Sequence, residues 1–256
     1  MTRDFTHQAY EKLLLALKRN GYTFHKFIDY AEGTNLSDLH VVLRHDVDRF
    51  PTRALKLAKL ENKHNIASSY FFRIKRVSFN KEIIYQIKGL GHEIGYHYED
   101  LCDTNGNYDL AWQRFQKNKK VFDLFGGVTC IAMHGRPFSK WNNQDLWKHF
   151  DYHENGILLD AYLDINWNDY IYLTDTGRAW NNTENRRDRV QTNIIGNMEL
   201  NTTHDLLSFL ASYRGKIVIS AHPERWTDNL IQWFFCLIQD TLVNQIKKLI
   251  KLFPDY

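Results

Sequence analysis

The feature that most constrains the fold is a regular alternation of short apolar runs with helical patterns. Apolar runs typical of buried strands cover 40–48, 67–74, 93–99, 129–134, 156–163, 170–174 and 216–222. Apolar residues at helical spacing fill the intervals, over 6–20, 52–64, 81–89, 109–125, 143–150, 204–213 and 228–253. Strands that alternate with helices at this spacing form βαβ units with a mostly parallel sheet. We therefore predict an α/β fold whose six or more strands form a closed or nearly closed barrel.

The chain is expected to form one domain over 1–256. Its 256 residues are 43% apolar and 25% charged, which excludes a disordered chain or a disulfide scaffold. The sequence has no low-complexity linker and no internal repeat, and its polar segment 176–203 reads as an excursion near the site. A formal net charge of +3 argues against a nucleic-acid partner.

The cysteines and the apolar runs bear on location. Cys102, Cys130 and Cys236 are odd in number and widely spaced, which favours free thiols in a reducing compartment. No apolar run resembles a secretory signal or approaches the ~18 residues of a spanning helix. We therefore expect a cytoplasmic protein without a transmembrane segment.

Four of the predicted strands end in chemically active residues. These ends read RHDVD at 44–48, HYE at 97–99, HGR at 134–136 and HPE at 222–224. A parallel barrel gathers the carboxyl ends of its strands on one face, where its active site lies. Two imidazoles and one carboxylate form a ligand set of catalytic zinc. Asp46 and Asp48 point the same way at period-two spacing, so that one could bind a metal while the other acts as a base.

Longer segments around these ends resemble motifs of the polysaccharide deacetylase superfamily, the NodB-homology or carbohydrate esterase family 4 proteins. The segments are LRHDVD at 43–48, GHEIGYHYEDL at 91–101, MHGRPFSKWNN at 133–143, YLTDTGRAW at 172–180 and ISAHPERW at 219–226. They follow the family's order within a motif-bearing core of about 40–226, and most resemble a divergent branch associated with lipopolysaccharide O-antigen biosynthesis. The resemblance implies a single-domain distorted (β/α)7 barrel and metal-dependent removal of an acyl group from a sugar.

The resemblance also implies roles for individual residues. Asp46 matches the general base, Asp48 the metal-binding aspartate and His97 the first metal-binding histidine. Arg136 matches the arginine that contacts the base and keeps it ionised. His222 matches the general acid that protonates the leaving group.

One position departs from the family pattern. Leu101 stands where the family has its second metal-binding histidine, so that a third ligand must come from elsewhere. His134 is the first choice because it ends the next strand, and Glu99 is the alternative because it shares a face with His97. The expected cofactor is a divalent metal, with Zn²⁺ preferred.

The remaining candidate residues are expected to contact substrate or to support the strands and the site. Candidate substrate contacts are Glu99, Asp175, Arg178, Trp180 and Trp226. Arg178, Arg186 and Arg189 could bind a phosphate or carboxylate, and a solvated loop is the open alternative. His45 and His92 are expected to support the strands or the site by hydrogen bonding.

Taken together, these patterns predict a hydrolase that removes an N-acyl group from a nucleotide-linked or lipid-linked amino sugar. By analogy with the family, acetyl is preferred over formyl. Two alternatives stay open: a catalytically silent barrel that binds a glycan intermediate or a synthesis partner, and a hydrolase of a non-sugar amide. The apolar run 230–238, followed by lysines, is either a helix that covers the barrel or a peripheral membrane-surface helix.

Overall fold

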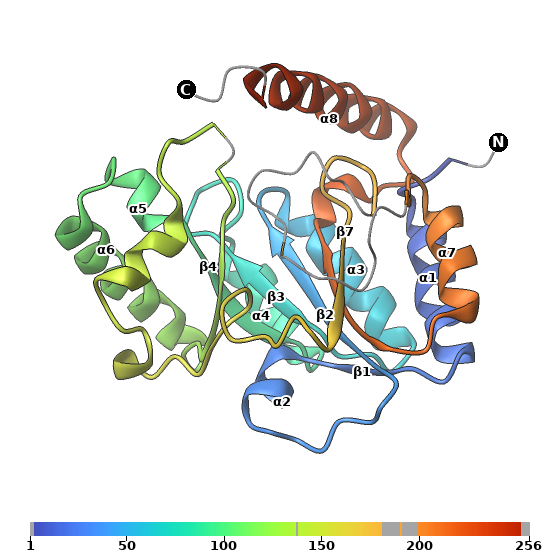
Figure 1. The fold of residues 1–256 in the computed structure, drawn as a ribbon, viewed down its shortest axis with the longest axis horizontal. Coiled ribbons are helices and arrows are strands. Elements are labelled where there is room, and N and C mark those ends of the chain that lie inside the picture. The colour runs from blue at the N-terminus through green and yellow to red at the C-terminus, as the bar shows by residue number, and fades with distance from the viewer. Residues whose placement is uncertain (1–2, 137, 181–189, 191–198, 252–256) are drawn as a thin grey trace.

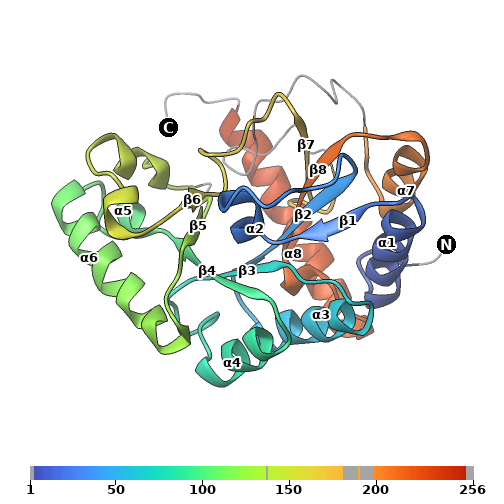
Figure 2. The same cartoon turned by 90° about the horizontal axis from the view of Figure 1, so that it is seen from below.

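The computed structural model describes residues 3–136, 138–180, 190 and 199–251. All strands of its sheet are parallel, in the order β6-β5-β4-β3-β2-β8-β7. The strands are β2 (His40–Val47), β3 (Ser69–Phe72), β4 (Glu93–Tyr98), β5 (Cys130–Met133), β6 (Leu159–Asp160), β7 (Tyr170–Thr174) and β8 (Lys216–Ala221). The sheet curls into a half-barrel, consistent with the distorted (β/α)7 barrel that the motif resemblance implies (Figure 2).

Helices surround the curled sheet, and one of them crosses its carboxyl end (Figure 1). The outer helices are α1 (His7–Arg19), α3 (Pro51–Lys63), α4 (Lys81–Gly89), α6 (Tyr108–Val121) and α7 (Thr203–Ser212). Helix α8 (Leu230–Lys251) crosses the carboxyl end of the strands, while α2 (Phe27–Ala31) lies at the opposite end against β2 and β6. Among the described residues, no helix is long and apolar enough to cross a bilayer.

The short polar residues before several helices explain where these helices begin. The side chains of Thr6, Asn80 and Asn107 accept hydrogen bonds from backbone N–H groups in the first turns of α1, α4 and α6. Thr202 and Asp205 form a reciprocal capping box at the start of α7. Such caps satisfy N–H groups that have no partner within the helix.

The predicted elements are confirmed except where an element is very short. Strand β1 (Thr23–His25), helix α2 and helix α5 (Asp100–Asp103) were not expected, because three to five residues are too few to show a period. The run 156–163 supplies only the two-residue strand β6, and 143–150 forms the 3₁₀-helix Asn143–Lys148. Residues 230–251 form one continuous helix.

Strand β2 is an inner strand of the sheet, and all eight of its residues are buried. One of its edges pairs with β8, while the other is shared by β1 at residues 40–42 and by β3 at residues 44–47. Burial on both faces is typical of parallel sheets covered by helices. The strand carries Asp46, and Asp48 directly follows its end, so both carboxylates lie at the middle of the carboxyl face.

The histidine next to Asp46 belongs to a buried hydrogen-bond network on the opposite face of β2. His45 Nε2 lies 2.6 Å from Glu61 Oε1, and the hydroxyls of Ser68 and Tyr70 donate to Glu61 Oε2 at 2.6 and 3.0 Å. His92 approaches the carbonyl of Ala58 at 3.0 Å through Nε2. The supporting roles expected for His45 and His92 are therefore confirmed.

Candidate active site

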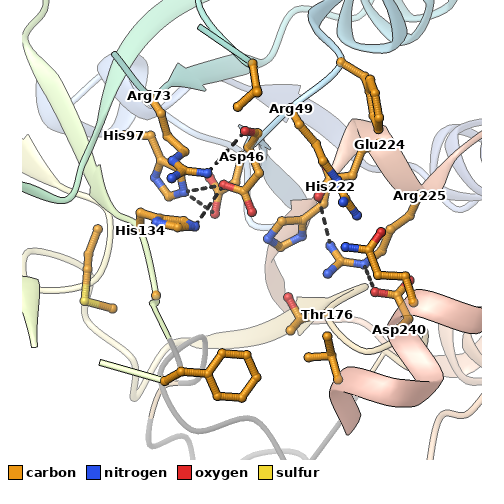
Figure 3. A pocket seen from close by; sticks show the side chains of 18 of the residues that line it. Asp46, Arg49, Arg73, His97, His134, Thr176, His222, Glu224, Arg225 and Asp240 are labelled. Carbon is orange, nitrogen blue, oxygen red and sulfur yellow. Dashed lines mark hydrogen bonds and ion pairs between the residues drawn. The ribbon is translucent and has the colours of Figure 1, made fainter. Parts of the chain in front are cut away.

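The carboxyl ends of β2, β4, β5 and β8 surround a cavity of about 400 Å³ (Figure 3). Its lining includes Asp46, Asp48, His97, His134 and His222. These residues are far apart in the sequence, and the parallel strands bring them to one face. The structure thus assembles the residues for which the strand ends and the motif resemblance predict catalytic or metal-binding roles.

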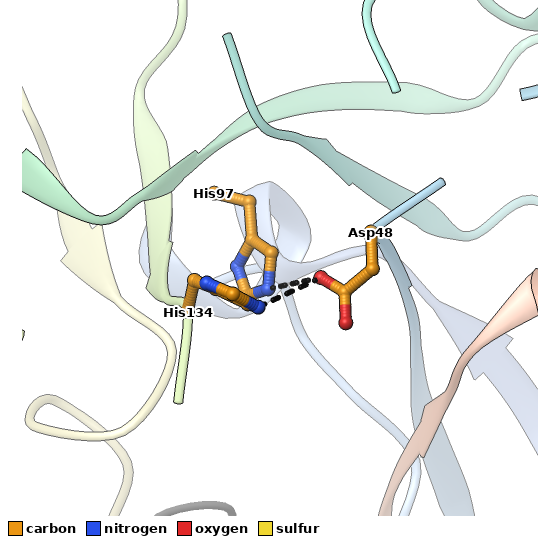
Figure 4. A group of neighbouring side chains, drawn as sticks. All are labelled: Asp48, His97 and His134. Carbon is orange, nitrogen blue, oxygen red and sulfur yellow. Dashed lines mark ion pairs between the residues drawn. The ribbon is translucent and has the colours of Figure 1, made fainter. Parts of the chain in front are cut away.

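Asp48, His97 and His134 form a compact group of possible metal ligands (Figure 4). One donor atom from each lies within 4.8 Å of the other two. Asp48 Oδ1 is 3.4 Å from His97 Nε2 and 3.4 Å from His134 Nε2. The three side chains come from the carboxyl ends of β2, β4 and β5, which lie within one parallel sheet and fix their mutual positions.

The surroundings of this group fit a divalent cation. His97 Nδ1 lies 3.0 Å from the carbonyl oxygen of Ala132, and His134 Nδ1 lies 3.0 Å from Glu99 Oε2. An N–H donated from Nδ1 leaves the Nε2 lone pair for a metal, which is the usual arrangement of metal-binding histidines. Asp48 Oδ1 is buried and has no hydrogen-bond partner among the described residues. Two imidazoles and a carboxylate make a ligand set typical of catalytic zinc.

Glu99 supports His134 instead of taking a ligand position. Arg73 donates to both carboxylate oxygens of Glu99 at 2.9 Å, and Lys75 Nζ lies 3.5 Å away. Burial opposes the charge of Glu99, but His134 and these cations lower its pKa to about 2. An ionised carboxylate on Nδ1 fixes the orientation of the His134 ring and raises the basicity of Nε2. Neither the metal role nor the substrate role expected for Glu99 matches these contacts.

The basic and the acidic members of the candidate metal group have pKa values shifted in opposite directions. Burial lowers the pKa of His134, but Asp48 and Glu99 raise it to about 9. Burial raises the pKa of Asp48, but His134 and His97 lower it well below the usual range. These shifts favour a carboxylate beside a protonated imidazole, and a cation held by Asp48 and His134 would take the place of that proton.

Asp46 is hydrogen-bonded through one carboxylate oxygen, and its other oxygen has no partner among the described residues. Its Oδ2 accepts a hydrogen bond from Arg44 Nη2 at 2.9 Å and one from Ser220 Oγ at 3.4 Å. Its Oδ1 is buried without a hydrogen-bond partner among the residues described. His97 Nε2 lies 4.0 Å from Oδ2, so that Asp46 borders the candidate metal group. The hydrogen bond from Arg44 fixes the orientation of the Asp46 carboxylate at the edge of the cavity.

The arginine on Asp46 is Arg44 rather than Arg136, which corrects the expectation from the motif. Arg136 Nη1 donates to Asp103 Oδ1 at 2.8 Å and lies 3.4 Å from Glu99 Oε2. It follows the end of β5 and reaches toward α5, away from β2. Arg44 shares a face of β2 with Asp46 at a spacing of two, and this spacing was the signal in the sequence.

His222 lies on the other side of the cavity and is oriented by Asp175 (Figure 3). Asp175 is fully buried and accepts from the His222 backbone N–H at 2.9 Å, while His222 Nδ1 lies 2.7 Å from its other oxygen. With Nδ1 held, Nε2 is the ring nitrogen left for a substrate. Burial and Arg225 lower the pKa of His222, but Asp175 raises it to about 9. Asp175 was expected to contact substrate, and its contacts make it a positioning residue instead.

Neither of the two tryptophans expected to contact substrate reaches the cavity. Trp180 and Trp226 are fully buried and pack together with Phe5 beneath the site. Trp226 Nε1 donates to Asp175 at 2.7 Å, and Trp180 Nε1 donates to Thr203 at 3.1 Å. The structure contradicts direct substrate contact, because both indoles turn inward after the strand ends.

The arginine expected to bind substrate is also held elsewhere. The Arg178 guanidinium lies 4.5 Å from the ring centroid of Phe5 and 5.1 Å from that of Trp233. It is not among the residues that line the cavity. Arg186 and Arg189 lie outside the described residues.

Leu101, which replaces the expected second histidine, is fully buried in α5 and belongs to the main hydrophobic core. The third donor of the metal group comes from His134, at the end of the next strand. The structure therefore offers a three-residue group without a histidine at this position.

The cavity lining also contains Glu224, from the predicted strand end at 222–224, and residues of α8 that had no signal in the sequence. Glu224 is buried, and Arg225 pairs with Asp240 of α8 at 3.5 Å. Burial and Asp48 raise the pKa of Glu224 to about 7. Gln239 and Lys247 of α8 also line the cavity. Their roles depend on where α8 packs, and helical periodicity alone does not determine that.

Comparisons with known proteins give only remote likenesses. No protein-family model matches the chain, and the search of curated proteins finds no significant match. A CE4 esterase from Streptococcus mutans aligns with a TM-score of 0.47 and 12% identity, over 87% of this chain and 86% of that one. A family 4 carbohydrate esterase from Bacillus anthracis aligns with a TM-score of 0.42 and 10% identity, over 90% and 84% of the two chains.

A CE4 family pseudoenzyme from Bacillus anthracis aligns with a TM-score of 0.44 and 15% identity. The alignment covers 81% of this chain and 60% of the pseudoenzyme, so that this chain spans less than two thirds of that protein's length.

Proposed function

We propose that the protein is a metal-dependent carbohydrate deacylase that hydrolyses the N-acyl group of an amino sugar. The observation that carries the proposal is the placement of two groups on one cavity. Asp48, His97 and His134 gather on one side, and His222 with its buried partner Asp175 stands on the other. Hydrolysis of an amide needs an activated water and a proton for the leaving amine, and the two sides suit these tasks.

Asp48, His97 and His134 would hold the cation, and their ligand types favour Zn²⁺. When bound there, the cation would supply Lewis acidity toward an acyl oxygen and toward water. Asp46 is placed to accept the proton of a water through Oδ1, which has no hydrogen-bond partner among the described residues. Arg44 fixes the orientation of that carboxylate through Oδ2.

The departing nitrogen needs a proton, and His222 is placed to donate it. Its raised pKa of about 9 keeps the imidazole protonated at neutral pH. Asp175 holds Nδ1 and stabilises the imidazolium, so that Nε2 is the acidic position toward the cavity. Asp46 as the proton acceptor and His222 as the proton donor would supply the general base and the general acid that hydrolysis of an amide needs.

We further propose an acetylated amino sugar, linked to a nucleotide or a lipid, as the substrate in surface-polysaccharide or O-antigen biosynthesis. The motif resemblance of segments 43–48, 91–101 and 219–226 supports this choice. A reducing, cytoplasmic location belongs to the same proposal and is consistent with three buried free cysteines.

The test is deacylation by protein stripped with a chelator and then reloaded with zinc. Acetyl and formyl amino sugars, free and nucleotide-linked, are offered, and the released carboxylic acid is measured. We expect release only with metal, and we expect His97→Ala to abolish metal binding. Full activity of the stripped protein would contradict the proposal. Binding of a glycan without product would favour the silent barrel, and turnover of only non-sugar amides would favour the other alternative.

A further inference from the structure

Helix α8 buries charged side chains and exposes apolar ones, which is the reverse of the usual arrangement in a helix that covers a protein core. Its charged side chains Asp240 and Lys247 are buried, and both line the cavity. Its outward side carries large apolar side chains that are between 44% and 69% exposed: Leu230, Ile231, Phe234, Phe235, Ile238, Leu242, Ile246 and Leu249. We call these eight residues the outer face of α8. A helix that covers a core normally turns its apolar stripe inward.

The outer face of α8 occupies one side of the helix, with the exposed Thr241 and Gln245 among its apolar members. At 100° per residue, its eight members fall within less than half of the helix circumference, opposite Cys236, Asp240 and Lys247. In Figure 1 the helix lies across the end of the molecule as a separate rod, with its far side turned away from the sheet. Exposed apolar surface of this kind marks an interaction site.

Loops at the carboxyl end of the barrel, where α8 lies, combine exposed apolar side chains with basic residues. Three exposed apolar side chains, Phe50, Val77 and Phe138, line the mouth of the cavity that α8 also borders. Each has a basic residue one or two positions away in the sequence, in Arg49-Phe50, Arg76-Val77 and Phe138-Ser139-Lys140. Bulky apolar groups next to cations are the composition that binds the headgroup region of an anionic membrane.

We propose that this end of the molecule docks on the surface of a bilayer that contains anionic lipid, with the outer face of α8 inserted among the headgroups. The charges of α8 agree with this occupant. Its acidic residue Asp240 is turned inward and lies 3.5 Å from Arg225, while Lys248 is exposed. The exposed part of α8 therefore presents apolar side chains and a cation to the surroundings.

A second copy of the chain fits this surface less well. A 22-residue helix is ~33 Å long and ~10 Å wide, and its convex surface offers little matching shape to the same convex surface of a second copy. Symmetric pairing would also bring the basic loops of the two copies together. A bilayer has no such requirement of shape, because it accommodates a single convex helix.

Flotation of the full-length, metal-loaded protein with vesicles tests the proposal. We expect flotation with phosphatidylcholine vesicles that contain phosphatidylglycerol, and about tenfold less with phosphatidylcholine alone. The double substitution Phe235→Glu, Leu242→Glu should abolish flotation. Leu110→Glu, at a comparably exposed position of α6, should leave it unchanged. Circular dichroism would show that both variants keep the fold.

Three outcomes would overturn the proposal: no flotation of the unaltered protein with either vesicle, unchanged flotation of the double variant, or equal loss in Leu110→Glu. A solution dimer that the double substitution dissociates, seen by sedimentation velocity, would assign the outer face to a second copy and overturn it too. Flotation requires no turnover, so its result is distinct from that of the deacylation assay. If the proposed function also holds, docking favours a lipid-linked over a nucleotide-linked substrate.

Discussion

At the scale of single residues, the role of each cavity residue depends on the contacts of those side-chain atoms that point away from the cavity. Asp46 and Asp48 lie two residues apart at the end of β2. Arg44 donates a hydrogen bond to Asp46, whereas Asp48 lies next to the imidazoles of His97 and His134. Residues of the same type thus receive different tasks from their neighbours. Substitution of these neighbours therefore tests each role while the cavity residue itself stays unchanged.

Glu99→Gln should weaken zinc binding by about 10- to 100-fold, because the substitution removes the charge that orients His134 and raises its basicity. Competition with a chromogenic chelator measures the affinity. Glu154→Gln, in the 3₁₀-helix His153–Asn155 away from the site, serves as the control. Unchanged affinity in Glu99→Gln would contradict the assigned support.

Asp175→Asn should move the alkaline limb of the activity profile to lower pH. Burial and Arg225 lower the pKa of His222, and Asp175 raises it to about 9, so the acid is protonated below that pH. Activity should fall as pH rises through about 9 in the parent and earlier in the variant. The profile of kcat against pH measures the shift, and an unmoved limb would contradict the role of His222.

The same pair also links stability to pH. A raised native pKa stabilises the fold below the unfolded value of about 6.5, and this contribution is lost as pH rises through about 9. Asp175→Asn should therefore reduce the pH dependence of the unfolding free energy in that interval.

At the scale of elements, short apolar runs predicted the strands and located the residues that end them. Asp46, His97 and His222 lie on the cavity because strand direction determines where their side chains point. Arg136 and Trp180 lie beyond their strand ends, and the turns that redirect them have no period to detect. Arg44 was missed although its spacing from Asp46 carried the signal.

Helix α8 illustrates the same limit. The sequence left open whether it covers the barrel or meets a membrane surface. The structure shows that it covers the cavity with its polar side. The orientation of an amphipathic helix depends on which partner it packs against, and a single sequence does not contain that information.

The short helix α5 gives a prediction at this scale. Leu101→His should not add a metal ligand, because Leu101 is fully buried in the core. Burial of the imidazole should destabilise the fold by about 1–3 kcal/mol. Leu101→Met, which keeps the volume, should cost less than about 1.5 kcal/mol. Urea unfolding and zinc titration measure both effects, and a gain in zinc affinity would contradict the placement of α5.

At the scale of the whole molecule, the curled sheet joins two sets of strands around the cavity. The candidate metal group comes from β2, β4 and β5, while His222 and Asp175 follow β8 and β7. A cation bound to the first set would therefore connect three strand ends that are far apart in the sequence. Its binding energy should appear in the stability of the fold.

Zinc at about 100 times its dissociation constant should stabilise the fold by about 2.7 kcal/mol. For a chain of this size, the melting temperature should rise by roughly 5–10 °C. His134→Ala should lose most of this rise, whereas His149→Ala, outside the cavity lining, should keep it. Calorimetry with and without zinc measures the change, and an equal rise in His134→Ala would contradict the assignment of the third ligand.

The central claim is that Asp48, His97 and His134 bind a divalent metal. Anomalous diffraction at the zinc edge from crystals of the zinc-loaded protein tests it most directly. We expect one strong peak bonded to Asp48 Oδ1, His97 Nε2 and His134 Nε2. No peak at this position, or a peak bonded to Glu99 in place of His134, would contradict the account.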